Sequence, residues 1–369
     1  MGKAMDLHDI LRGAAQFRAS DVHLMEDHVP YLRVDGMLRP VQAPPLDHET
    51  LMFYLKSMMP QVLETVLEER RGIDFAYQFG KDCRYRVNAY YERDNLKLVF
   101  RSIPLKIPTI DELELPQTLK RLAMLQRGMV LVTGATGSGK STTLAAMVQY
   151  INSTQSRCLI TIEDPIEYIY ENQKSILTQR EVGVDVLEFH VGLVQALRQD
   201  PDVILIGEMR TAETMHVTIQ AAETGHLVLS TLHTTNSVQT VERIIASFPE
   251  DERNLVRELL SFNVKGAVSQ RLLRRTGGKG RVAAMEIMVA NATIEKLIYE
   301  DRIRDIPGVL RGREEGMMLF DQSLADLVRA GKVDMEEAER YSDDVYAMRR
   351  YVKGVSTSGD NAGIIAGFG

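Results

Sequence analysis

The sequence predicts an α/β protein in which a small N-terminal α+β domain precedes a larger domain built on a parallel sheet. Between residues 129 and 231, short and uniformly apolar segments alternate with segments of helical periodicity. This alternation is typical of a parallel sheet whose two faces are both covered by helices. Before residue 104, short helical and strand-like segments are mixed without that regular order.

The composition supports a folded protein with more than one domain. The chain has 369 residues, which at about 150 residues per domain corresponds to two or three domains. Its 44% hydrophobic and 26% charged residues exclude collagen, mucin and whole-chain disorder. The formal net charge of −7 argues against a generic nucleic-acid coat. The two cysteines, Cys83 and Cys158, are far apart in sequence, so we expect them to be reduced and buried, as in the cytosol.

The sequence also predicts a cytoplasmic protein without an integral membrane segment. No apolar run approaches the roughly 18 residues that a membrane-spanning helix needs. The first residues lack the apolar core of a signal peptide. Gly2 is followed by Asp6 where a myristoylation signal has Ser or Thr.

The N-terminal elements follow from periodicity. Residues 6–17 place Leu7, Ile10, Leu11 and Ala14 on one helical face. Residues 83–103 alternate polar and apolar side chains, which predicts an antiparallel hairpin turning near residues 93–95. We further expect strands at 22–24 and 31–34, an Asp35–Gly36 turn, and helical structure over 49–70 interrupted at Pro60.

The later elements give the domain bounds. Pro104, Pro108 and Pro116 indicate a linker over 103–116, which separates a domain over 1–102 from one over 117–353. We expect the following elements in the second domain: strands at 129–133, 158–162, 203–206 and 227–231, and helices at 141–151, 189–198 and 211–224. From about residue 239 the pattern is interpreted as helical, with a basic, Gly-rich loop at 274–281. Residues 354–369 are rich in Gly, Ser and Asn and are expected to be a disordered tail.

The strongest motif is the phosphate-binding P-loop pattern GxxxxGK[ST] between an expected strand and an expected helix. Its glycines let successive backbone N–H groups point at phosphate oxygens, and the helix dipole adds positive potential. Lys140 is expected to neutralise phosphate charge, and the Ser141 hydroxyl to bind Mg²⁺. The expected ATP-binding residues are Gly134, Ala135, Thr136, Gly137, Ser138, Gly139, Lys140, Ser141 and Thr142.

The other strands end in residues suited to phosphate chemistry. In doubly wound folds, ligands bind at the carboxyl ends of the strands. The second strand runs into Glu163 and Asp164, the third into Glu208, and the fourth into His233. Gly207 precedes Glu208, where a Walker B strand would usually end in the Asp that holds Mg²⁺. We therefore expect Glu208 to be the catalytic base or the group that orients the attacking water. Glu163 or Asp164 is expected to complete the metal shell through water, and His233 to contact the γ-phosphate or relay its presence.

Two further groups carry open alternatives. His226 has either the same role as His233 or a structural role at the start of a strand. Phosphoryl transfer also gains from a cation on the γ-phosphate, often an arginine from a neighbouring subunit. We find no obvious arginine for this role within the motifs near the P-loop. The hairpin of the first domain offers Arg84, Arg86, Arg93 and Arg101, although most of these are expected to be ordinary exposed strand residues.

The motifs resemble those of the secretion-ATPase superfamily and, more narrowly, the type IV pilus retraction ATPases of the PilT/PilU family. The resemblance covers nearly the whole chain, and its motifs are long and specific. The stretches that carry it are Ser20–Leu24, Arg33–Gly36, Thr133–Ala146, Ile162–Glu167, Leu197–Val203, Gly207–Arg210, Glu223–Leu227 and His233–Thr234.

The resemblance implies a PAS-like N-terminal domain joined to a RecA-like P-loop ATPase domain in a hexameric ring, with ATP and Mg²⁺ between subunits. It implies catalytic roles for Glu163, Glu208 and His233, a place for His226 in a histidine box, and trans-acting arginines at Arg86 and Arg101. It also implies a location at the periphery of the inner membrane. The implied partners are the platform protein of the pilus machine and a paralogous motor.

Two features bear on the branch of the family. The chain lacks the longer N-terminal region and tetracysteine motif of the extension and type II secretion ATPases, which favours the retraction branch. The stretch Thr293–Ile298 matches a C-terminal Ala-Ile-Arg-Asn-Leu-Ile motif of PilT-like motors, but Glu295 stands at the position of its arginine. Residues 316–324 look more like PilU, so a PilU-like auxiliary motor and a divergent PilT paralogue both fit.

Other functional classes stay open. The unusual Walker B strand also fits a nucleotide-binding regulatory or scaffold subunit with little turnover. The chain also fits a motor of a related secretion machine. A small-molecule kinase would need a lid-like insertion, which we do not find. The basic segment 271–281 has no interleaved aromatics, so it is interpreted as a solvated loop or subunit-interface patch and not as a nucleic-acid site.

Overall fold

The computed structural model describes residues 5–34, 36–80, 83–103 and 106–354. It divides into two compact units. The N-terminal unit comprises Met1–Ile107, Glu163–Tyr170 and Gln179–Glu188, and the C-terminal unit comprises Pro108–Ile162, Glu171–Thr178 and Phe189–Gly369. Asp35 of the expected turn, Pro104 of the expected linker, and all but the first residue of the expected tail lie outside the described residues.

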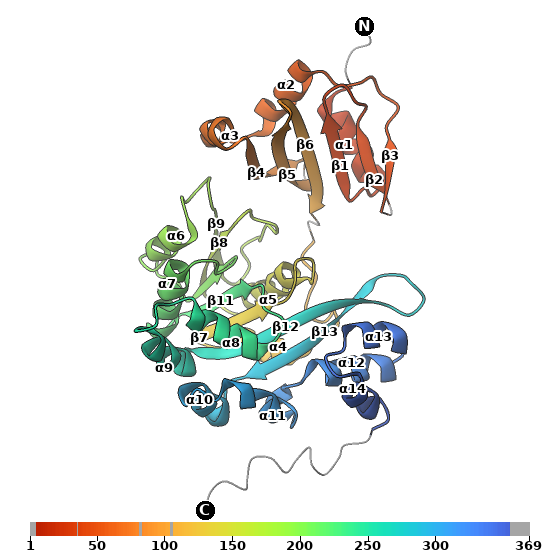
Figure 1. Cartoon of the computed structure of the whole chain (residues 1–369). Helices are drawn as coiled ribbons and strands as arrows, with labels where there is room; N and C mark the ends of the chain where they lie inside the picture. Colours follow the sequence, from red (N-terminus) through yellow and green to blue (C-terminus); the bar gives the residue numbers. More distant parts are fainter. Residues whose placement is uncertain (1–4, 35, 81–82, 104–105, 355–369) are drawn as a thin grey trace, which may run out of the picture. The chain divides into compact units, whose positions relative to one another are not determined.

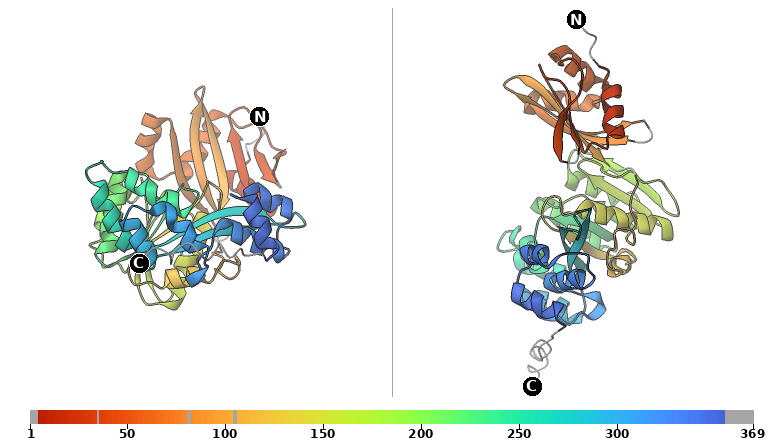
Figure 2. Two further views of the ribbon diagram at one scale, coloured as in Figure 1. Left: turned by 60° about the horizontal axis from the view of Figure 1, so that its bottom comes forward. Right: turned by 90° about the vertical axis from the view of Figure 1, so that its right-hand side faces the viewer.

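The N-terminal unit contains a six-stranded sheet in the order β3-β2-β1-β6-β5-β4, whose neighbours are antiparallel (Figures 1 and 2). Its strands are β1 (Asp21–Met25), β2 (Tyr31–Val34), β3 (Met37–Pro40), β4 (Gly72–Phe79), β5 (Cys83–Glu92) and β6 (Asn95–Ile103). The expected hairpin is confirmed as β5–β6. It turns at Arg93 and Asp94, which both have positive φ, the backbone geometry of a two-residue hairpin turn. Strands β3 and β4 were not predicted.

Three helices bury apolar side chains against this sheet: α1 (Leu7–Gln16), α2 (His48–Met58) and α3 (Glu64–Arg70). The predicted face of α1 is buried, and Asp6 caps this helix by accepting a hydrogen bond from the His8 N–H. Helix α2 ends two residues before Pro60, as predicted. The PAS-like character of this unit stays a prediction.

The C-terminal unit is built on a seven-stranded sheet in the order β13-β12-β7-β11-β10-β8-β9 (Figure 1). Its strands are β7 (Gly128–Thr133), β8 (Cys158–Glu163), β9 (Ile176–Glu181), β10 (Val203–Ile206), β11 (Leu227–Leu232), β12 (Val264–Arg274) and β13 (Arg281–Val289). Strands β8, β10, β11, β7 and β12 pair in parallel, which confirms the predicted parallel sheet. Every residue of β7, β10 and β11 is buried, as expected for strands covered on both faces.

The helices of this unit pack around that sheet. They are α4 (Thr118–Ala123), α5 (Lys140–Thr154), α6 (Phe189–Ala196), α7 (Ala212–Glu223), α8 (Ser237–Ala246), α9 (Arg253–Asn263), α10 (Ala292–Tyr299), α11 (Ile306–Leu310), α12 (Phe320–Arg329), α13 (Met335–Tyr341) and α14 (Val345–Val352). Helices α12, α13 and α14 lie together beside the β12–β13 hairpin and share a core with it (Figures 1 and 2).

The prediction of purely helical structure after residue 239 was wrong, because β12 and β13 form an antiparallel hairpin there. The basic loop predicted at 274–281 is the turn of this hairpin. The basic segment 271–281 is partly paired within the chain, since Arg271 of β12 binds Asp343 and Arg275 of the turn binds Glu114. The two cysteines are free but half-buried, whereas we expected them to be buried.

Candidate functional site

The P-loop connects β7 to α5, and the side chain of its lysine forms hydrogen bonds with the backbone of the loop. The Lys140 Nζ atom donates hydrogen bonds to the carbonyls of Gly134 and Ala135, at 2.8 and 3.1 Å. Gly134 and Gly139 have positive φ, and their neighbours leave no room for a side chain. A Cβ atom on Gly134 would lie 2.5 Å from the Gln270 carbonyl oxygen. The two glycines are therefore required by the shape of the loop.

Strand β12 holds the P-loop from outside the motif, a contact that sequence reasoning missed. The buried Gln270 side chain donates to the Ser138 carbonyl and accepts from the Thr143 hydroxyl, both at 2.7 Å. One amide thus ties the loop to the first turns of α5. The signal in the sequence was weak, because Gln270 lies more than 120 positions from both partners.

The loop has the features of a phosphate cradle. The Ser138 hydroxyl is buried and has no hydrogen-bond partner among the described residues. The first turn of α5 carries Ser141, and the N-terminus of this helix adds favourable potential for an anion. Among the described residues, no cluster of three or more His, Cys, Asp or Glu residues could hold a metal ion. A site that shares Mg²⁺ with nucleotide phosphates fits these residues, because Mg²⁺ needs only one or two protein ligands there.

The strand register places the predicted residues at one edge of the sheet. Thr133 pairs with Leu232, so Gly134 and His233 leave β7 and β11 at the same level. Ile206 pairs with Ser230, so Gly207 and Glu208 follow β10 close to that level. The carboxyl ends of parallel strands form the usual binding edge of such sheets.

Glu208 has two polar side-chain partners. Its Oε2 atom lies 3.2 Å from Nε2 of His233, and its Oε1 atom pairs with the Arg210 guanidinium. The carboxylate is 14% exposed, whereas the His233 and Arg210 side chains are 52% and 67% exposed. The structure brings Glu208 and His233 together as the sequence suggested. Sequence reasoning did not single out Arg210, which contacts Glu208 directly.

His226 lies at the other end of β11. Its ring bonds the Ala221 carbonyl at 2.9 Å and the Thr224 hydroxyl at 3.2 Å. A strand rises about 3.3 Å per residue, so β11 separates His226 from His233 by about 20 Å. These contacts favour the structural alternative for His226.

The acidic segment after β8 has its own network within the N-terminal unit. The Glu163 carboxylate accepts a hydrogen bond from Gln179 at 3.3 Å, and the Asp164–Pro165 peptide bond is cis. Arg84 donates to the Ile166 carbonyl at 3.3 Å. Burial lowers the pKa of Arg84, and the charges of Glu181 and Glu163 oppose that shift. Arg84 is thus a half-buried partner of this segment and not the exposed strand residue we expected.

Arg86 and Arg101 lie directly opposite each other on β5 and β6. Each has a carboxylate partner, Asp74 for Arg86 at 3.3 Å and Asp21 for Arg101 at 3.0 Å. Like charges at opposite positions on an antiparallel pair repel each other. In this chain each of the two guanidinium groups is therefore balanced by one carboxylate.

The sequence was next compared with known proteins. The profile of the family described as "Type II/IV secretion system protein" matches residues 3–340. The chain belongs to this family. A member from Pseudomonas aeruginosa described as "Type IV pilus retractation ATPase PilT" is 43% identical over 335 residues, covering 90% of this chain and 97% of that protein. The "Type IV pilus ATPase PilU" of the same organism is 40% identical over 350 residues, covering 95% and 92%.

Two solved structures share the fold. The crystal structure of the pilus retraction motor PilT with bound ADP matches with a TM-score of 0.87 and 39% identity, over 94% of this chain and 99% of that chain. The Legionella pneumophila ATPase DotB matches with a TM-score of 0.75 and 27% identity, over 92% and 97%. None of the described helices of this family member is long and apolar enough to cross a membrane.

Proposed function

We propose that this protein is an ATP-hydrolysing motor that powers the retraction of type IV pili, as expected for a PilT- or PilU-like secretion ATPase. The observation that carries the proposal is the Glu208–His233 pair, which lies at the same sheet edge as a complete P-loop. Relatives described as PilT and PilU match nearly the full chain, which supports the retraction role.

In this proposal, residues 134–142 bind the phosphates of ATP, and Lys140 neutralises their charge. Ser141 would hold Mg²⁺ together with a water-mediated contact from Glu163 or Asp164. When bound, the ion supplies charge neutralisation at the β- and γ-phosphates. Glu208 orients and deprotonates the attacking water, and His233 places the Glu208 carboxylate and senses the γ-phosphate.

The arginines of the N-terminal sheet act on the nucleotide of a neighbouring subunit in a hexameric ring. The support for this is that Arg86 and Arg101 occupy opposite positions on β5 and β6, so two guanidinium groups lie on one face of the sheet, and guanidinium groups suit a γ-phosphate. Because this cation is needed mainly in the transition state, Arg101→Ala should abolish hydrolysis and leave nucleotide binding intact. Phosphate release and binding of a fluorescent ATP analogue would check this prediction. A loss of binding alone, or no effect, would contradict it.

Motion would arise when γ-phosphate contacts order one arrangement of the two units and hydrolysis releases it. Residues 103–116 would serve as the hinge. The motor would work at the cytoplasmic side of the inner membrane. Its partners there would be the platform protein of the pilus machine and a paralogous motor.

The choice between a PilT-like and a PilU-like role depends on α10. Glu295, at the position of the arginine of PilT-like motors, forms an ion pair of 2.8 Å with Lys265 of β12. The negative charge that Glu295 brings to this position is therefore balanced by Lys265 within the same chain. A PilU-like auxiliary motor and a divergent PilT paralogue both fit this pairing, and retraction in cells without the gene distinguishes them.

Steady-state phosphate release tests the enzymatic claim. The wild-type protein with Mg²⁺ and ATP should turn over, and Glu208→Gln should lower kcat by about 10²- to 10⁴-fold, as expected for the loss of a general base. ADP affinity should be unchanged. Equal, near-zero rates for both proteins would instead favour the scaffold alternative.

A further inference from the structure

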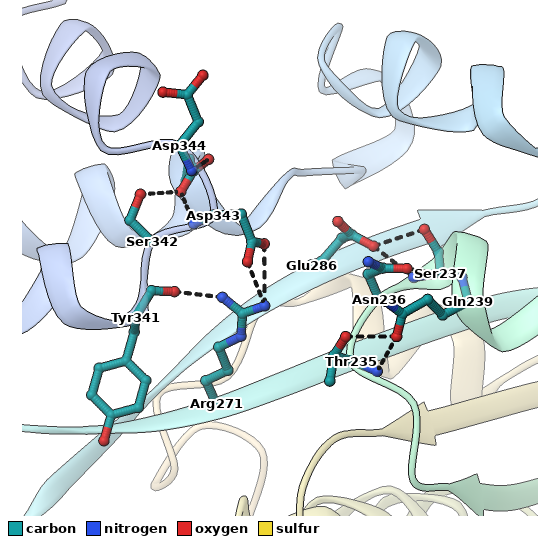
Figure 3. Close-up of polar contacts among 11 residues, drawn as sticks. Thr235, Asn236, Ser237, Gln239, Arg271, Glu286, Tyr341, Ser342, Asp343 and Asp344 are labelled. Carbon is teal, nitrogen blue, oxygen red and sulfur yellow. Dashed lines mark hydrogen bonds and ion pairs between the residues drawn. The ribbon is translucent and has the colours of Figure 1, made fainter.

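The segment that carries His233 is tied to the helix that follows it. Residues 233–236 connect β11 to α8. The Thr235 hydroxyl donates to the Gln239 side-chain oxygen at 2.7 Å, and the Asn236 side chain caps α8 by accepting from the Gln239 N–H at 2.8 Å (Figure 3). The position of His233 therefore depends on where α8 begins.

The start of α8 is fixed from the sheet by a buried carboxylate. Glu286 of β13 accepts two hydrogen bonds from Ser237, the first residue of α8, one from its N–H and one from its hydroxyl, both at 2.7 Å (Figure 3). Glu286 is 6% exposed and Ser237 is 1% exposed. A carboxylate at this place also interacts favourably with the free N–H groups and the dipole of the helix.

Holding a charge at this buried place is costly. Burial raises the pKa of Glu286, the Ser237 hydrogen bonds oppose this shift, Asp343 adds to it, and Arg271 opposes it. Arg271 is itself held by Asp343 at 2.9 Å and by the Tyr341 carbonyl (Figure 3). The charge is offset by the hydrogen bonds it accepts, because an apolar residue here would leave the buried N–H and hydroxyl of Ser237 without an acceptor.

We infer that Glu286 is a positioning residue for ATP hydrolysis: by fixing Ser237, it holds the preceding His233 within hydrogen-bond distance of Glu208. The chain of contacts runs from β13 through the start of α8 to the carboxylate proposed as the base. This inference rests on the proposed function. It adds a residue that lies outside the P-loop, the acidic segment and the histidine-bearing strand end.

The test combines kinetics with hydrogen exchange on the full-length protein. Glu286→Gln keeps the shape and removes the charge, and Ser237→Ala removes one of the two hydrogen bonds but keeps the N–H. Each variant is also made together with His233→Ala. Glu339→Gln removes a carboxylate that pairs with Arg349 on the C-terminal helices and serves as the matched control.

We expect Glu286→Gln and Ser237→Ala to lower kcat about tenfold or more, as small misplacements of catalytic groups do, with KM within about twofold. In the His233→Ala background, neither change should lower kcat further. Amide exchange of residues 233–240 should be faster in Glu286→Gln, and the control should match wild type. Ser237→Ala provides the same kinetic test if Glu286→Gln does not fold.

Two results would overturn the inference: a wild-type kcat in folded Glu286→Gln, or equal losses of kcat with and without His233. The exchange measurement separates this proposal from the proposed function. If wild type showed no turnover, the motor proposal would fail. In that case, unchanged amide exchange of residues 233–240 in Glu286→Gln would overturn the positioning role of Glu286 as well. Faster exchange would support that role.

Discussion

At the scale of single residues, the site is organised around Glu208. Two side chains, Arg210 and His233, contact its two oxygen atoms. A carboxylate with two anchors has a narrow range of orientations, which suits the water-orienting role proposed for Glu208. His233 was found from its place after a strand. Arg210 was not, because nothing in the sequence shows that its side chain turns back toward Glu208.

Arg210→Ala should lower kcat about tenfold, because Glu208 would keep one anchor and sample more orientations. ATP affinity should change by less than about twofold, since the P-loop contacts are untouched. Phosphate release and nucleotide titration check this prediction. Arg304→Ala, which removes an exposed arginine outside the family motifs, is the control. A kcat equal to that of wild type would show that the Arg210 contact is dispensable.

Gln270→Ala should weaken both the fold and nucleotide binding. It leaves the Ser138 carbonyl and the Thr143 hydroxyl without a buried partner, at a cost of about 2–3 kcal/mol in the free energy of unfolding. The P-loop should then hold phosphate less well. Chemical denaturation and ADP titration measure the two effects, with exposed Gln220→Ala as the control. An unchanged ADP affinity would contradict the role of Gln270 at the loop.

At the scale of elements, β12 joins two regions of the C-terminal unit. Successive side chains on a strand point to opposite faces of the sheet. Accordingly, Gln270 contacts the P-loop and Arg271 contacts the C-terminal helices, where its guanidinium lies 3.9 Å from the centre of the Phe320 ring. A displacement of β12 would therefore reach both regions.

The pairing of α10 with β12 predicts a charge dependence. Glu295→Arg would place a guanidinium against Lys265 and should lower the free energy of unfolding by about 1 kcal/mol, the scale of a partly exposed ion pair. Adding Lys265→Glu should restore most of that loss. A double-mutant cycle by denaturation measures the coupling. If the two substitutions changed the free energy of unfolding additively, the Glu295–Lys265 pair would contribute nothing to stability.

Glu114 gives a pH dependence. Hydrogen bonds from Lys332 and Arg275 lower the pKa of Glu114 below its ordinary value of 4.5. The unfolded chain thus binds this proton more tightly than the folded protein does, and the stabilisation is complete above about pH 4.5 and is lost as the pH falls through the folded pKa. Glu114→Gln should accordingly cost stability at pH 7 and progressively less below pH 4.5.

Unfolding free energies of wild type and Glu114→Gln at several pH values would check this. The exposed Glu250→Gln serves as the control. A difference between wild type and Glu114→Gln that stayed constant with pH would mean that the two ion pairs of Glu114 add no stability.

At the scale of the whole molecule, the elements that could be predicted from the sequence are those with a local apolar pattern. The buried strands β7, β10 and β11 and the amphipathic α1 were predicted because apolar periodicity alone determines them. Strand β12 was missed because it buries polar residues. Ser269 and Gln270 are tolerated there because they bond Thr133 and the P-loop, partners more than 120 positions away. Such long-range pairing leaves no local periodicity.

The site shows the same division. The P-loop and the strand-end residues Glu208 and His233 follow from motif and topology. The side chains that position them, among them Arg210, Gln270 and Glu286, depend on tertiary contacts. The roles of Arg86 and Arg101 depend on a neighbouring subunit and stay predictions.

The most direct test of the central claim is the retraction of fluorescently labelled pili in cells that lack only this gene. These cells should extend pili without retracting them. Wild-type protein should restore retraction, and Glu208→Gln should not. Retraction at the wild-type rate with Glu208→Gln as the only copy would contradict the account. Retraction that persists without the gene would mean that this protein is not the primary retraction motor.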